Sequence, residues 1–436
     1  MSALLLETLA RARSGAGSAP ALRHGAEALS FDRLLSRVEK RARELAEPDE
    51  NRFVTLDAED SITFLVDFLA ARLAARPALV HPPATPSVLR ARREEAVRAS
   101  EVRSDETIFF SSGSVGAGKA VPLSESRLLF AALAFPDGAS IVPEDRVAVG
   151  VPVGHVFGLV RGALTALAIG AETVFWSPRR DPVGEASQWG ATIALLSAPQ
   201  IALSAGREAP VRLRGILSGG APVPERILRA VEARGAPVRL GWGLTETAGL
   251  GSRQRLDRPR RPGTVGPPAP GMRVEIMTAE GGTRGPGETG EIRIAGPATF
   301  ERYLDPDETR PFDACGRLRT GDMGYLDETG ELVVRGRAAY AIRARGRWVC
   351  AEELEAAARE HPGISEAAAL PDGESFALLV ETADSSAAFR RNMRDFLARR
   401  LPSFARPKLL VCLPEIPRGP GGKVDRAAAS RWVPAP

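Results

Sequence analysis

The first hundred residues alternate between helical and strand-like patterns of apolar positions. Apolar residues recur at helical spacing in 31–46 and 61–75, which predicts two helices. Residues 53–57 and 78–81 are short apolar runs typical of strands, and 87–100 is a polar helix that follows a proline-rich loop. This stretch offers no catalytic pattern, so we interpret it as helices packed on the edge of a sheet.

One pattern then repeats between residues 147 and 250: an apolar strand, a glycine-bearing turn and a helix. It occurs in 147–175, in 213–235 (LRGILSGG followed by a helix) and in 238–250 (VRLGWGLTETAGL). Repeated units of this kind predict stacked, mostly parallel sheets. The carboxyl edge of such a sheet would carry small residues, against which a flat ligand could lie.

The pattern changes after about residue 255. Short strands joined by glycine turns occupy 273–282, 290–297 and 331–337, which predicts a β-rich subdomain. Within it, the run RTGDMGYLDETGE is expected to place Asp322 and Asp327 on tight turns.

The last hundred residues mix helical and strand patterns and have the size of an independent domain. We therefore place a domain boundary between residues 336 and 337, which gives a large domain, 1–336, and a C-terminal domain, 337–436. The predicted fold is α/β: stacked, mostly parallel sheets with a β-rich subdomain, followed by a small, mobile α+β domain.

Composition excludes several classes of function. Hydrophobic residues make up 44% and charged residues 26%, and a net charge of +4 with few aromatics (6%) gives no indication of nucleic-acid binding. Cys315, Cys350 and Cys412 lack metal-ligand spacing, which predicts reduced thiols of a cytoplasmic protein. Residues 1–15 predict an amphipathic helix rather than a signal peptide, and no window has the length of a membrane span.

Lysine is rare in this chain. Of 58 basic Lys and Arg residues only four are lysines, and two of these, Lys119 and Lys423, lie in glycine-rich turns. Lysine and arginine are not interchangeable beside a reacting phosphate, so these two are the first candidates for catalysis. Lys119 closes a loop whose backbone N–H groups and hydroxyls suit a polyphosphate: Ser111, Ser112, Gly113, Ser114, Val115, Gly116, Ala117 and Gly118.

This loop has two other interpretations. One is a glycine- and serine-rich turn with a solvated lysine. The other is the phosphate loop of nucleoside triphosphatases, which needs Ser or Thr after the lysine and a helix directly behind it. Here Ala120 follows the lysine, and 120–124 (AVPLS) has the pattern of a strand.

Six motifs in order span about residues 105 to 427: the loop itself, LSGGAP, GWGLTET, RTGDMGYLD, VVRGRA and PRGPGGKVDR. In this order the sequence resembles the adenylate-forming superfamily, which includes acyl- and aryl-CoA synthetases. The resemblance implies a ligase with ATP and Mg²⁺ that turns a small carboxylic acid into acyl-AMP and pyrophosphate. A thiol of coenzyme A, or of the phosphopantetheine of an acyl carrier protein, would then displace AMP.

The resemblance also implies roles for residues of the large domain. Thr245 would hydrogen-bond the α-phosphate, and Glu246 would hold Mg²⁺, a cation that prefers oxygen ligands. His155, Gly241 and Gly243 would line the acid pocket. The β- and γ-phosphates would be held by Ser111, Ser112, Gly113, Ser114, Gly116 and Lys119, and the adenine by Gly219, Gly220, Ala221 and Trp242.

Further roles follow for the region around the boundary and beyond it. Asp322 would accept hydrogen bonds from the ribose hydroxyls, and Arg337 would contact the ribose. Lys423 would neutralise charge as acyl-AMP forms, since nucleotidyl transfer depends on positioning and charge stabilisation. Gly346 would lie beside the tunnel for the thiol.

The sequence also departs from the family pattern. Gly118 replaces a proline and Ala120 a glycine, and Ala339 lacks the polar side chain usual at the hinge. A protein that only adenylates, or a nucleotide-binding protein without catalysis, therefore remains an alternative. Gly243 leaves depth for an acid larger than acetate, either aryl or acyl, and the acceptor stays open between coenzyme A and a carrier protein.

Overall fold

The computed structural model describes residues 17–47, 52–111, 118–134, 141–278, 280–305, 311–345, 347–418 and 424–433. The helix predicted for residues 1–15 lies outside them. The chain forms two compact units. Unit 1 comprises Met1–Val223, Ile227–Val274 and Ile294–Leu318, and unit 2 comprises Pro224–Arg226, Glu275–Arg293 and Arg319–Pro436.

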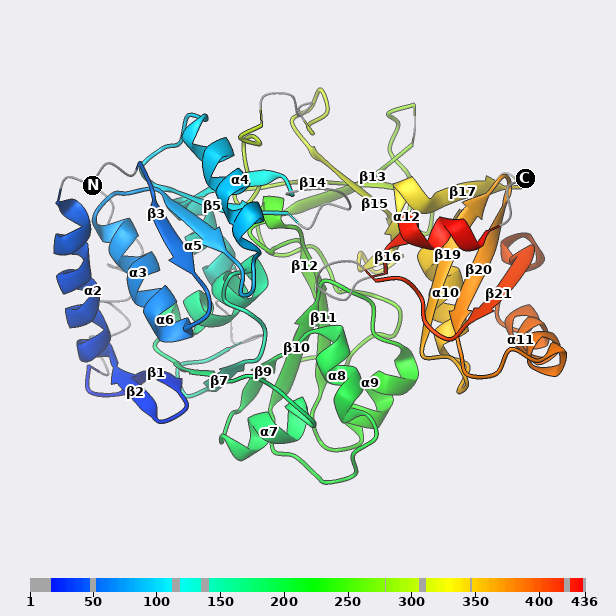
Figure 1. Cartoon of the computed structure of the whole chain (residues 1–436), viewed down its shortest axis with the longest axis horizontal. Coiled ribbons are helices and arrows are strands. Elements are labelled where there is room, and N and C mark those ends of the chain that lie inside the picture. Colours follow the sequence, from blue (N-terminus) through cyan, green and yellow to red (C-terminus); the bar gives the residue numbers. More distant parts are fainter. Residues whose placement is uncertain are drawn as a thin grey trace. The chain divides into compact units, whose positions relative to one another are not determined.

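Among the described residues, unit 1 contains an eight-stranded sheet in the order β12-β11-β10-β9-β7-β8-β1-β2 (Figure 1). Its pairs are parallel except β1 with β2 and β11 with β12. The central strands are short and buried on both faces, as parallel strands covered by helices are. The strands are β1 (Pro20–His24), β2 (Glu27–Ser30), β7 (Arg146–Val149), β8 (Glu172–Phe175), β9 (Ile193–Leu195), β10 (Gly215–Gly219), β11 (Val238–Trp242) and β12 (Ser252–Arg253).

Helices cover this sheet and supply its core. Apolar side chains such as Val183, Ile201 and Val231 pack against Ile216 and Val238 of the strands. A π-helical segment, Phe157–Leu164, follows the turn after β7 and is apolar almost throughout. The helices are α5 (Glu125–Leu133), α6 (Thr165–Ile169), α7 (Pro182–Gln188), α8 (Ala198–Ser204) and α9 (Glu225–Glu232).

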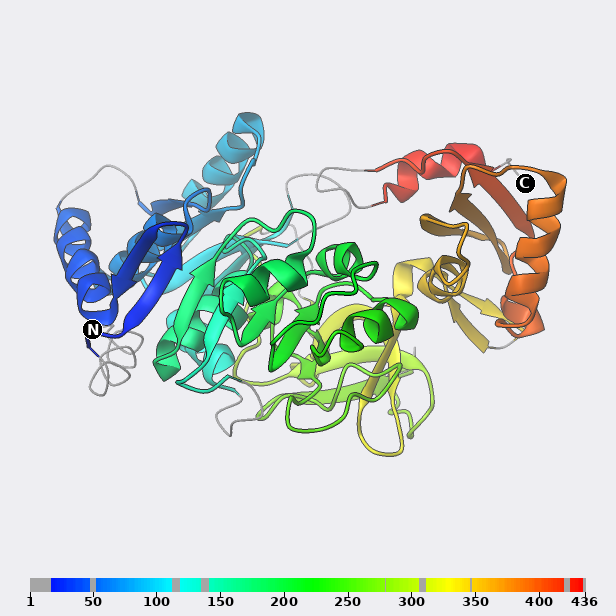
Figure 2. The same ribbon diagram turned by 90° about the horizontal axis from the view of Figure 1, so that it is seen from below.

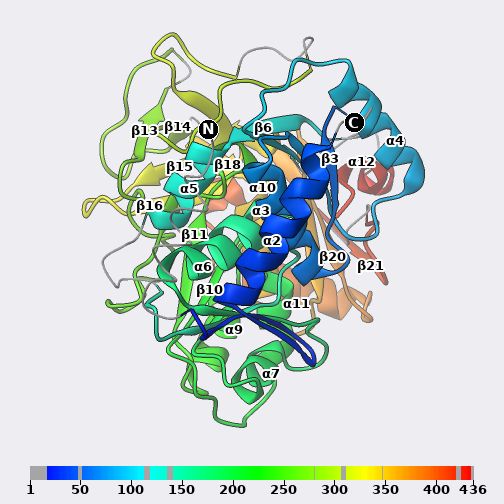
Figure 3. The same ribbon diagram turned by 90° about the vertical axis from the view of Figure 1, so that its left-hand side faces the viewer.

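A second sheet of unit 1 has the order β3-β4-β5-β6, parallel except for the last pair. Helices α2 and α3 lie side by side, and the Arg41 Nε of α2 donates to Asp67 of α3 at 2.8 Å (Figure 3). The helices and strands predicted between residues 31 and 100 are confirmed. The helices and strands of this part of the chain, through the end of the sheet, are α2 (Phe31–Ala46), β3 (Val54–Asp57), α3 (Ser61–Leu73), β4 (Ala78–His81), α4 (Ser87–Arg98), β5 (Glu106–Phe110) and β6 (Ala120–Ser124).

The β-rich subdomain is a sheet in the order β13-β14-β15-β16, most of which belongs to unit 2. The prediction that Asp322 lies on a tight turn is wrong: it lies inside β15 and pairs with Arg337 of β16. Asp327 does begin a turn, in which its carbonyl oxygen accepts a hydrogen bond from the Gly330 N–H. The glycines around Asp322 imitate a turn, but pairing with a distant strand decides its conformation. The strands are β13 (Arg273–Met277), β14 (Gly290–Ala295), β15 (Leu318–Leu326) and β16 (Leu332–Arg337).

The rest of unit 2 is the predicted α+β region. Figure 2 shows α11 along the sheet β19-β20-β21, where Met393 and Phe396 of the helix pack against Leu378 and Val380. The elements are β17 (Ala341–Ala344), β18 (Arg347–Cys350), α10 (Ala351–Arg359), β19 (Glu366–Asp372), β20 (Ser375–Glu381), α11 (Ala387–Ala398), β21 (Leu409–Leu413) and α12 (Arg426–Ala429).

The predicted α/β fold class is confirmed. The compact units do not test the predicted domain boundary between residues 336 and 337, which stays a prediction. All three cysteines are described and none is in a disulfide, as predicted. Among the described helices, none combines the length and apolar character needed to cross a membrane.

Candidate active site

The structure brings the predicted adenine-binding residues of unit 1 to one edge of the larger sheet. Strands β10 and β11 are parallel neighbours, and Gly219 pairs with Gly241 at their carboxyl ends. A Cβ on Gly219 would lie 2.9 Å from the Gly241 carbonyl oxygen, and Gly220 has φ +81°, so both positions need glycine. Gly220, Ala221 and Trp242 continue from these strand ends, where a flat ring could lie against bare backbone.

Thr245 and Glu246 lie in a single 3-10 turn, Thr245–Thr247, directly after this edge. The turn is closed by Leu244, whose N–H donates to the Thr247 hydroxyl at 3.1 Å, and by Ala248 at φ +52°. Because Ala248 adopts the left-handed conformation that non-glycine residues rarely take, the turn is held by its surroundings. It presents Thr245 and Glu246, both half-buried, on adjacent positions.

The ends of the predicted phosphate loop meet at the end of the β5–β6 pair. The Ser111 N–H donates to the Lys119 carbonyl oxygen at 3.0 Å, and the Lys119 N–H donates to the Ser111 hydroxyl at 3.3 Å. Ser112, Gly113, Ser114 and Gly116 lie outside the described residues. Strand β6 begins immediately after Lys119, which removes the helix that the nucleoside triphosphatase interpretation requires.

Gly118 explains one departure from the family pattern. Its φ is +76°, and a Cβ there would collide with the Ser111 carbonyl oxygen. Proline is fixed near φ −65° and could not adopt this conformation. The loop therefore closes in a way that needs glycine where the family usually has proline.

Tyr303, which no sequence motif indicated, contacts two of the predicted site residues. Its hydroxyl donates to Glu246 Oε1 at 2.8 Å, and the Lys119 Nζ lies 4.9 Å from its ring centroid. The three tyrosines of the chain are as rare as its lysines, so the same reasoning from rarity could have pointed to it.

His155 and Gly243 flank the same edge of the sheet. His155 is exposed and precedes the π-helical segment, while its neighbour Gly154 packs against Pro82 beyond β4. At Gly243 a Cβ would lie 2.5 Å from the Gly249 carbonyl oxygen, so backbone already fills the space of a side chain. The glycine thus has a packing reason of its own, and the role of both residues in an acid pocket stays a prediction.

Unit 2 holds the predicted ribose contacts. Asp322 is 6% exposed and accepts a hydrogen bond from Arg337 Nη1 at 2.8 Å across the β15–β16 pair. The structure therefore joins the two residues that were predicted to bind the same sugar. Lys423 and Gly346 lie outside the described residues, and their roles stay predictions.

The segment after Arg337 forms a 3-10 turn, Ala338–Tyr340, in which Ala339 is exposed. Tyr340 is covered by the guanidinium of Arg426, 4.5 Å from its ring centroid. Arg426 also pairs with Glu355 and lies 3.9 Å from Glu352, both on α10. An aromatic and cationic contact therefore fixes this turn where the family usually has a polar side chain.

The described residues fit Mg²⁺ only as an ion that is shared between the protein and a bound nucleotide. In the described part of the chain, no group of three or more His, Cys, Asp or Glu residues could hold a metal ion. Mg²⁺ in nucleotide sites commonly takes one or two carboxylates and completes its shell with phosphate oxygens and water. Glu246 can supply such a carboxylate, so the ion would be held jointly with the nucleotide.

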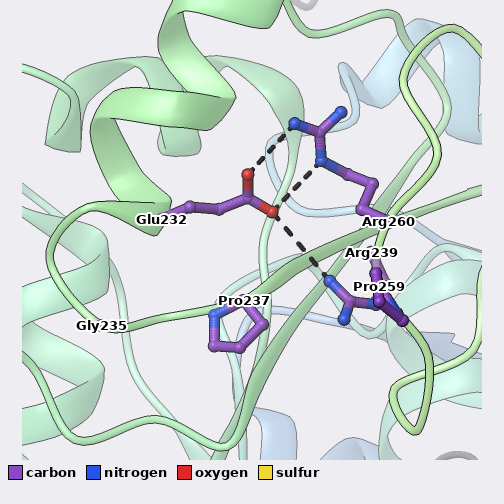
Figure 4. A pocket seen from close by; sticks show the side chains of 6 residues that line it. All are labelled: Glu232, Gly235, Pro237, Arg239, Pro259 and Arg260. Atoms are coloured by element: carbon purple, nitrogen blue, oxygen red, sulfur yellow. Dashed lines mark hydrogen bonds and ion pairs between the residues drawn. The ribbon is translucent and has the colours of Figure 1, made fainter.

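A pocket of about 370 Å³ lies elsewhere, at the amino end of β11 (Figure 4). Glu232 accepts two hydrogen bonds from Arg260, at 3.1 Å each, and lies 4.0 Å from Arg239. The remaining lining comes from Gly235, Pro237 and Pro259. Because none of these residues belongs to the predicted site, we interpret the pocket as the place where the arginine-rich segment 255–261 is fastened to the sheet.

Comparison with known families and proteins agrees with this geometry. The AMP-binding enzyme family matches residues 79–304, and the AMP-binding enzyme C-terminal domain matches residues 353–423. The chain is 32% identical to sulfoacetate–CoA ligase of Cupriavidus necator and 31% identical to indoleacetate–CoA ligase of Aromatoleum aromaticum. Each match covers 73% of this chain and 65% of the relative, so the chain spans about two-thirds of the length of these proteins.

A solved structure shows the same fold. It is o-succinylbenzoate CoA synthetase of Bacillus subtilis in complex with its acyl-adenylate intermediate, with a TM-score of 0.85, 21% identity and 98% of both chains covered. The first family match includes the phosphate loop, the glycine edge and Glu246, and the second ends at Lys423. The chain belongs to the AMP-binding enzyme family, within the adenylate-forming superfamily that its motifs resemble.

Proposed function

We propose that this protein activates a small-molecule carboxylic acid with ATP. The acid carboxylate attacks the α-phosphorus, the bond from that phosphorus to the bridging oxygen of the pyrophosphate breaks, and acyl-AMP and pyrophosphate form. The observation that carries the proposal is the arrangement in unit 1, where Tyr303 joins Glu246 to Lys119. Such chemistry needs charge placed around phosphates more than covalent participation of the protein.

Each part of unit 1 has a role in this proposal. Gly219, Gly220 and Trp242 would hold the adenine at the edge of the sheet, while Thr245 would donate to the α-phosphate. Lys119 would bind the β- and γ-phosphates. Mg²⁺, when bound, supplies positive charge to the phosphate oxygens. Glu246 would orient that ion, and the glycine edge would exclude water from the reacting carboxylate.

Unit 2 would contribute the ribose contacts and the second cation. Asp322, oriented by Arg337, would accept from the ribose hydroxyls. Lys423 would neutralise the charge that develops on the α-phosphate and the attacking carboxylate.

We further propose that acyl-AMP passes its acyl group to the thiol of coenzyme A. The thiolate attacks the acyl carbon, and AMP leaves with the electrons of the acyl–phosphate bond. The names of the relatives as CoA ligases support this acceptor. The exposed Ala339 favours, as a second candidate, a protein that stops at acyl-AMP or uses a carrier protein. Reduced cysteines and these substrates support a cytoplasmic location.

The test is a panel of acids supplied with ATP and Mg²⁺. Sulfoacetate, indoleacetate and o-succinylbenzoate represent small, aryl and dicarboxylic acids, and fatty acids and acetate complete the set. We expect at least one acid larger than acetate to release AMP and pyrophosphate in equal amounts. Adding coenzyme A should then give a thioester detectable by mass spectrometry. Thioester only with a phosphopantetheinylated carrier would change the acceptor, and no AMP release with any acid would contradict the proposal.

A further inference from the structure

A short segment, Phe300–Leu304, connects the two phosphate-related parts of unit 1 and is called here the bridging segment. At one end, the Phe300 N–H donates to the Glu246 carbonyl oxygen at 2.8 Å. At the other end, the Leu304 N–H donates to the carbonyl oxygen of Ala120, the residue after Lys119, at 3.1 Å. The backbone of five residues therefore spans from the Glu246 turn to the closure of the phosphate loop.

Ion pairs hold the bridging segment in place. Glu301 accepts from Arg127 Nη2 at 2.7 Å and also pairs with Arg103. Arg302 donates twice to Glu106 of β5, at 2.7 and 3.0 Å, and Glu106 is 1% exposed. Burial alone would raise the pKa of Glu106, but hydrogen bonds from Arg302 and Arg103 outweigh it and lower this pKa. The buried carboxylate thus stays charged at neutral pH and keeps the segment attached to the sheet.

Tyr303 is the side chain between the two ends. Its ring packs edge-on against Phe300, with centroids 4.7 Å apart, and its face lies under Lys119. Its hydroxyl donates to Glu246 Oε1, whereas the second oxygen, Oε2, accepts no hydrogen bond within the described residues. A neutral donor therefore fixes one carboxylate oxygen and leaves the other available to a ligand.

We propose that Tyr303 is a positioning residue that sets Glu246 and Lys119 at a fixed separation for binding of magnesium and nucleotide phosphates. This inference rests on the proposed function, because it takes Glu246 and Lys119 as the metal and phosphate contacts. Preorganisation of this kind improves binding by removing the cost of ordering two flexible side chains when the ligand arrives. The Tyr303 hydroxyl orients Glu246, the proposed magnesium contact, and the Tyr303 ring positions Lys119, the proposed phosphate contact.

These two actions can be separated by substitution and by equilibrium binding of a non-hydrolysable ATP analogue, measured by calorimetry with and without Mg²⁺. Tyr303→Phe removes only the hydroxyl, so we expect the gain in affinity on adding Mg²⁺ to fall about tenfold, as loss of a hydrogen bond to a charged group predicts. Binding without Mg²⁺ should not change. Tyr303→Leu also removes the ring face, so metal-free binding should weaken about two- to fivefold.

Matched controls distinguish positioning from general damage. Tyr325→Phe removes a hydroxyl from β15 and should leave both affinities unchanged, and thermal unfolding should be similar for all variants. Glu246→Gln should abolish most of the Mg²⁺ effect, and adding Tyr303→Phe to it should cost nothing further. Such non-additivity is expected only if the hydroxyl acts through Glu246.

Equal Mg²⁺ dependence in Tyr303→Phe and Tyr325→Phe, with a wild-type protein that does depend on Mg²⁺, would overturn this inference and leave the proposed function intact. Additive losses in the double variant would overturn it in the same way. A wild-type protein that binds the analogue without any effect of Mg²⁺ would instead contradict the proposed function, and the inference with it.

Discussion

Two carboxylates of this chain, Glu246 in unit 1 and Glu352 in unit 2, have opposite surroundings. Glu246 is half-buried and receives a hydrogen bond from the neutral Tyr303 hydroxyl. Glu352 is largely enclosed: its Oε2 has no hydrogen-bond partner among the described residues, and a side chain on Gly336 would collide with it. Burial raises the pKa of Glu352, and the nearby Glu355 adds to the rise while Arg426 opposes it.

The different surroundings of Glu246 and Glu352 indicate different roles for the two carboxylates. Around Glu246, the neutral Tyr303 hydroxyl binds one carboxylate oxygen, and the cationic Lys119 lies over the Tyr303 ring. Around Glu352, two acids of α10 share Arg426, which also covers Tyr340 in the turn after Arg337. We propose that the first arrangement prepares a binding site, whereas the second holds the turn after Arg337 in place at a cost in stability.

The largest expected effect tests whether Lys423 of unit 2 takes part in adenylation. Lys423→Ala should lower acid-dependent pyrophosphate exchange about 100-fold or more, because removing one donor that stabilises the transition state typically costs about 3 to 4 kcal/mol. Lys408→Ala, an exposed lysine of the same unit, is the matched control and should exchange normally. Near-normal exchange in Lys423→Ala would remove Lys423 from the proposed catalytic residues.

The next effect concerns nucleotide affinity. Asp322→Asn removes the charged acceptor that Arg337 orients, so the Kd for ATP should rise about ten- to a hundredfold, as for hydrogen bonds to charged groups. Isothermal calorimetry measures it, and Asp327→Asn, on the neighbouring turn, should bind as the wild type does. If both variants lost affinity equally, the pair Asp322–Arg337 would be structural rather than ribose-binding.

The smallest expected effect is a change with pH in the stability that depends on Glu352. Because the folded pKa of Glu352 lies above its unfolded value, the folded state holds the proton to higher pH, and stability falls as pH rises above about 4.5. Glu352→Gln should therefore unfold at a higher temperature than the wild type at pH 8, by on the order of 2 °C, and the difference should shrink toward pH 4.5. Thermal unfolding between pH 4.5 and 8 measures it.

Glu381 provides a comparison of the opposite sign within unit 2. Burial alone would raise its pKa, but hydrogen bonds from the Ile416 N–H and Ser365, with the charge of Arg418, lower it. Its contribution is present above its unfolded pKa and is lost as pH falls through the folded one. Glu381→Gln should therefore be destabilised most at neutral pH. The same sign for both variants would contradict the contrast between enclosed and paired acids.

The fold could be predicted because periodic apolar positions determine which faces are buried. The parallel strands β7 to β11 and the helices between them follow directly from such patterns, and so does the strand after Lys119. Asp322 was misplaced because glycines on both sides suggested a turn, although pairing with Arg337 holds it in a strand. Local composition does not show which distant strand a segment will join.

Sequence motifs indicated the residues proposed to contact ligands, but not the residue that contacts those side chains in the folded chain. Glu246 and Lys119 belong to motifs, but Tyr303 lies 57 positions from Glu246, and only the folded chain brings them together. The contact of Arg426 with Glu355 spans 71 positions in the same way. The sequence shows that Gly118 replaces the proline usual in the family, but not why. The structure gives the reason, because the positive φ of Gly118 is one that proline cannot adopt.

The most direct test of the account is incorporation of labelled pyrophosphate into ATP by the whole chain, with and without a carboxylic acid. We expect exchange only when a suitable acid and Mg²⁺ are present, and expect Glu246→Gln and Lys423→Ala each to abolish most of it. Exchange that does not depend on the acid, or that survives both substitutions, would contradict the proposal that Glu246 and Lys423 act in the activation of a carboxylic acid with ATP.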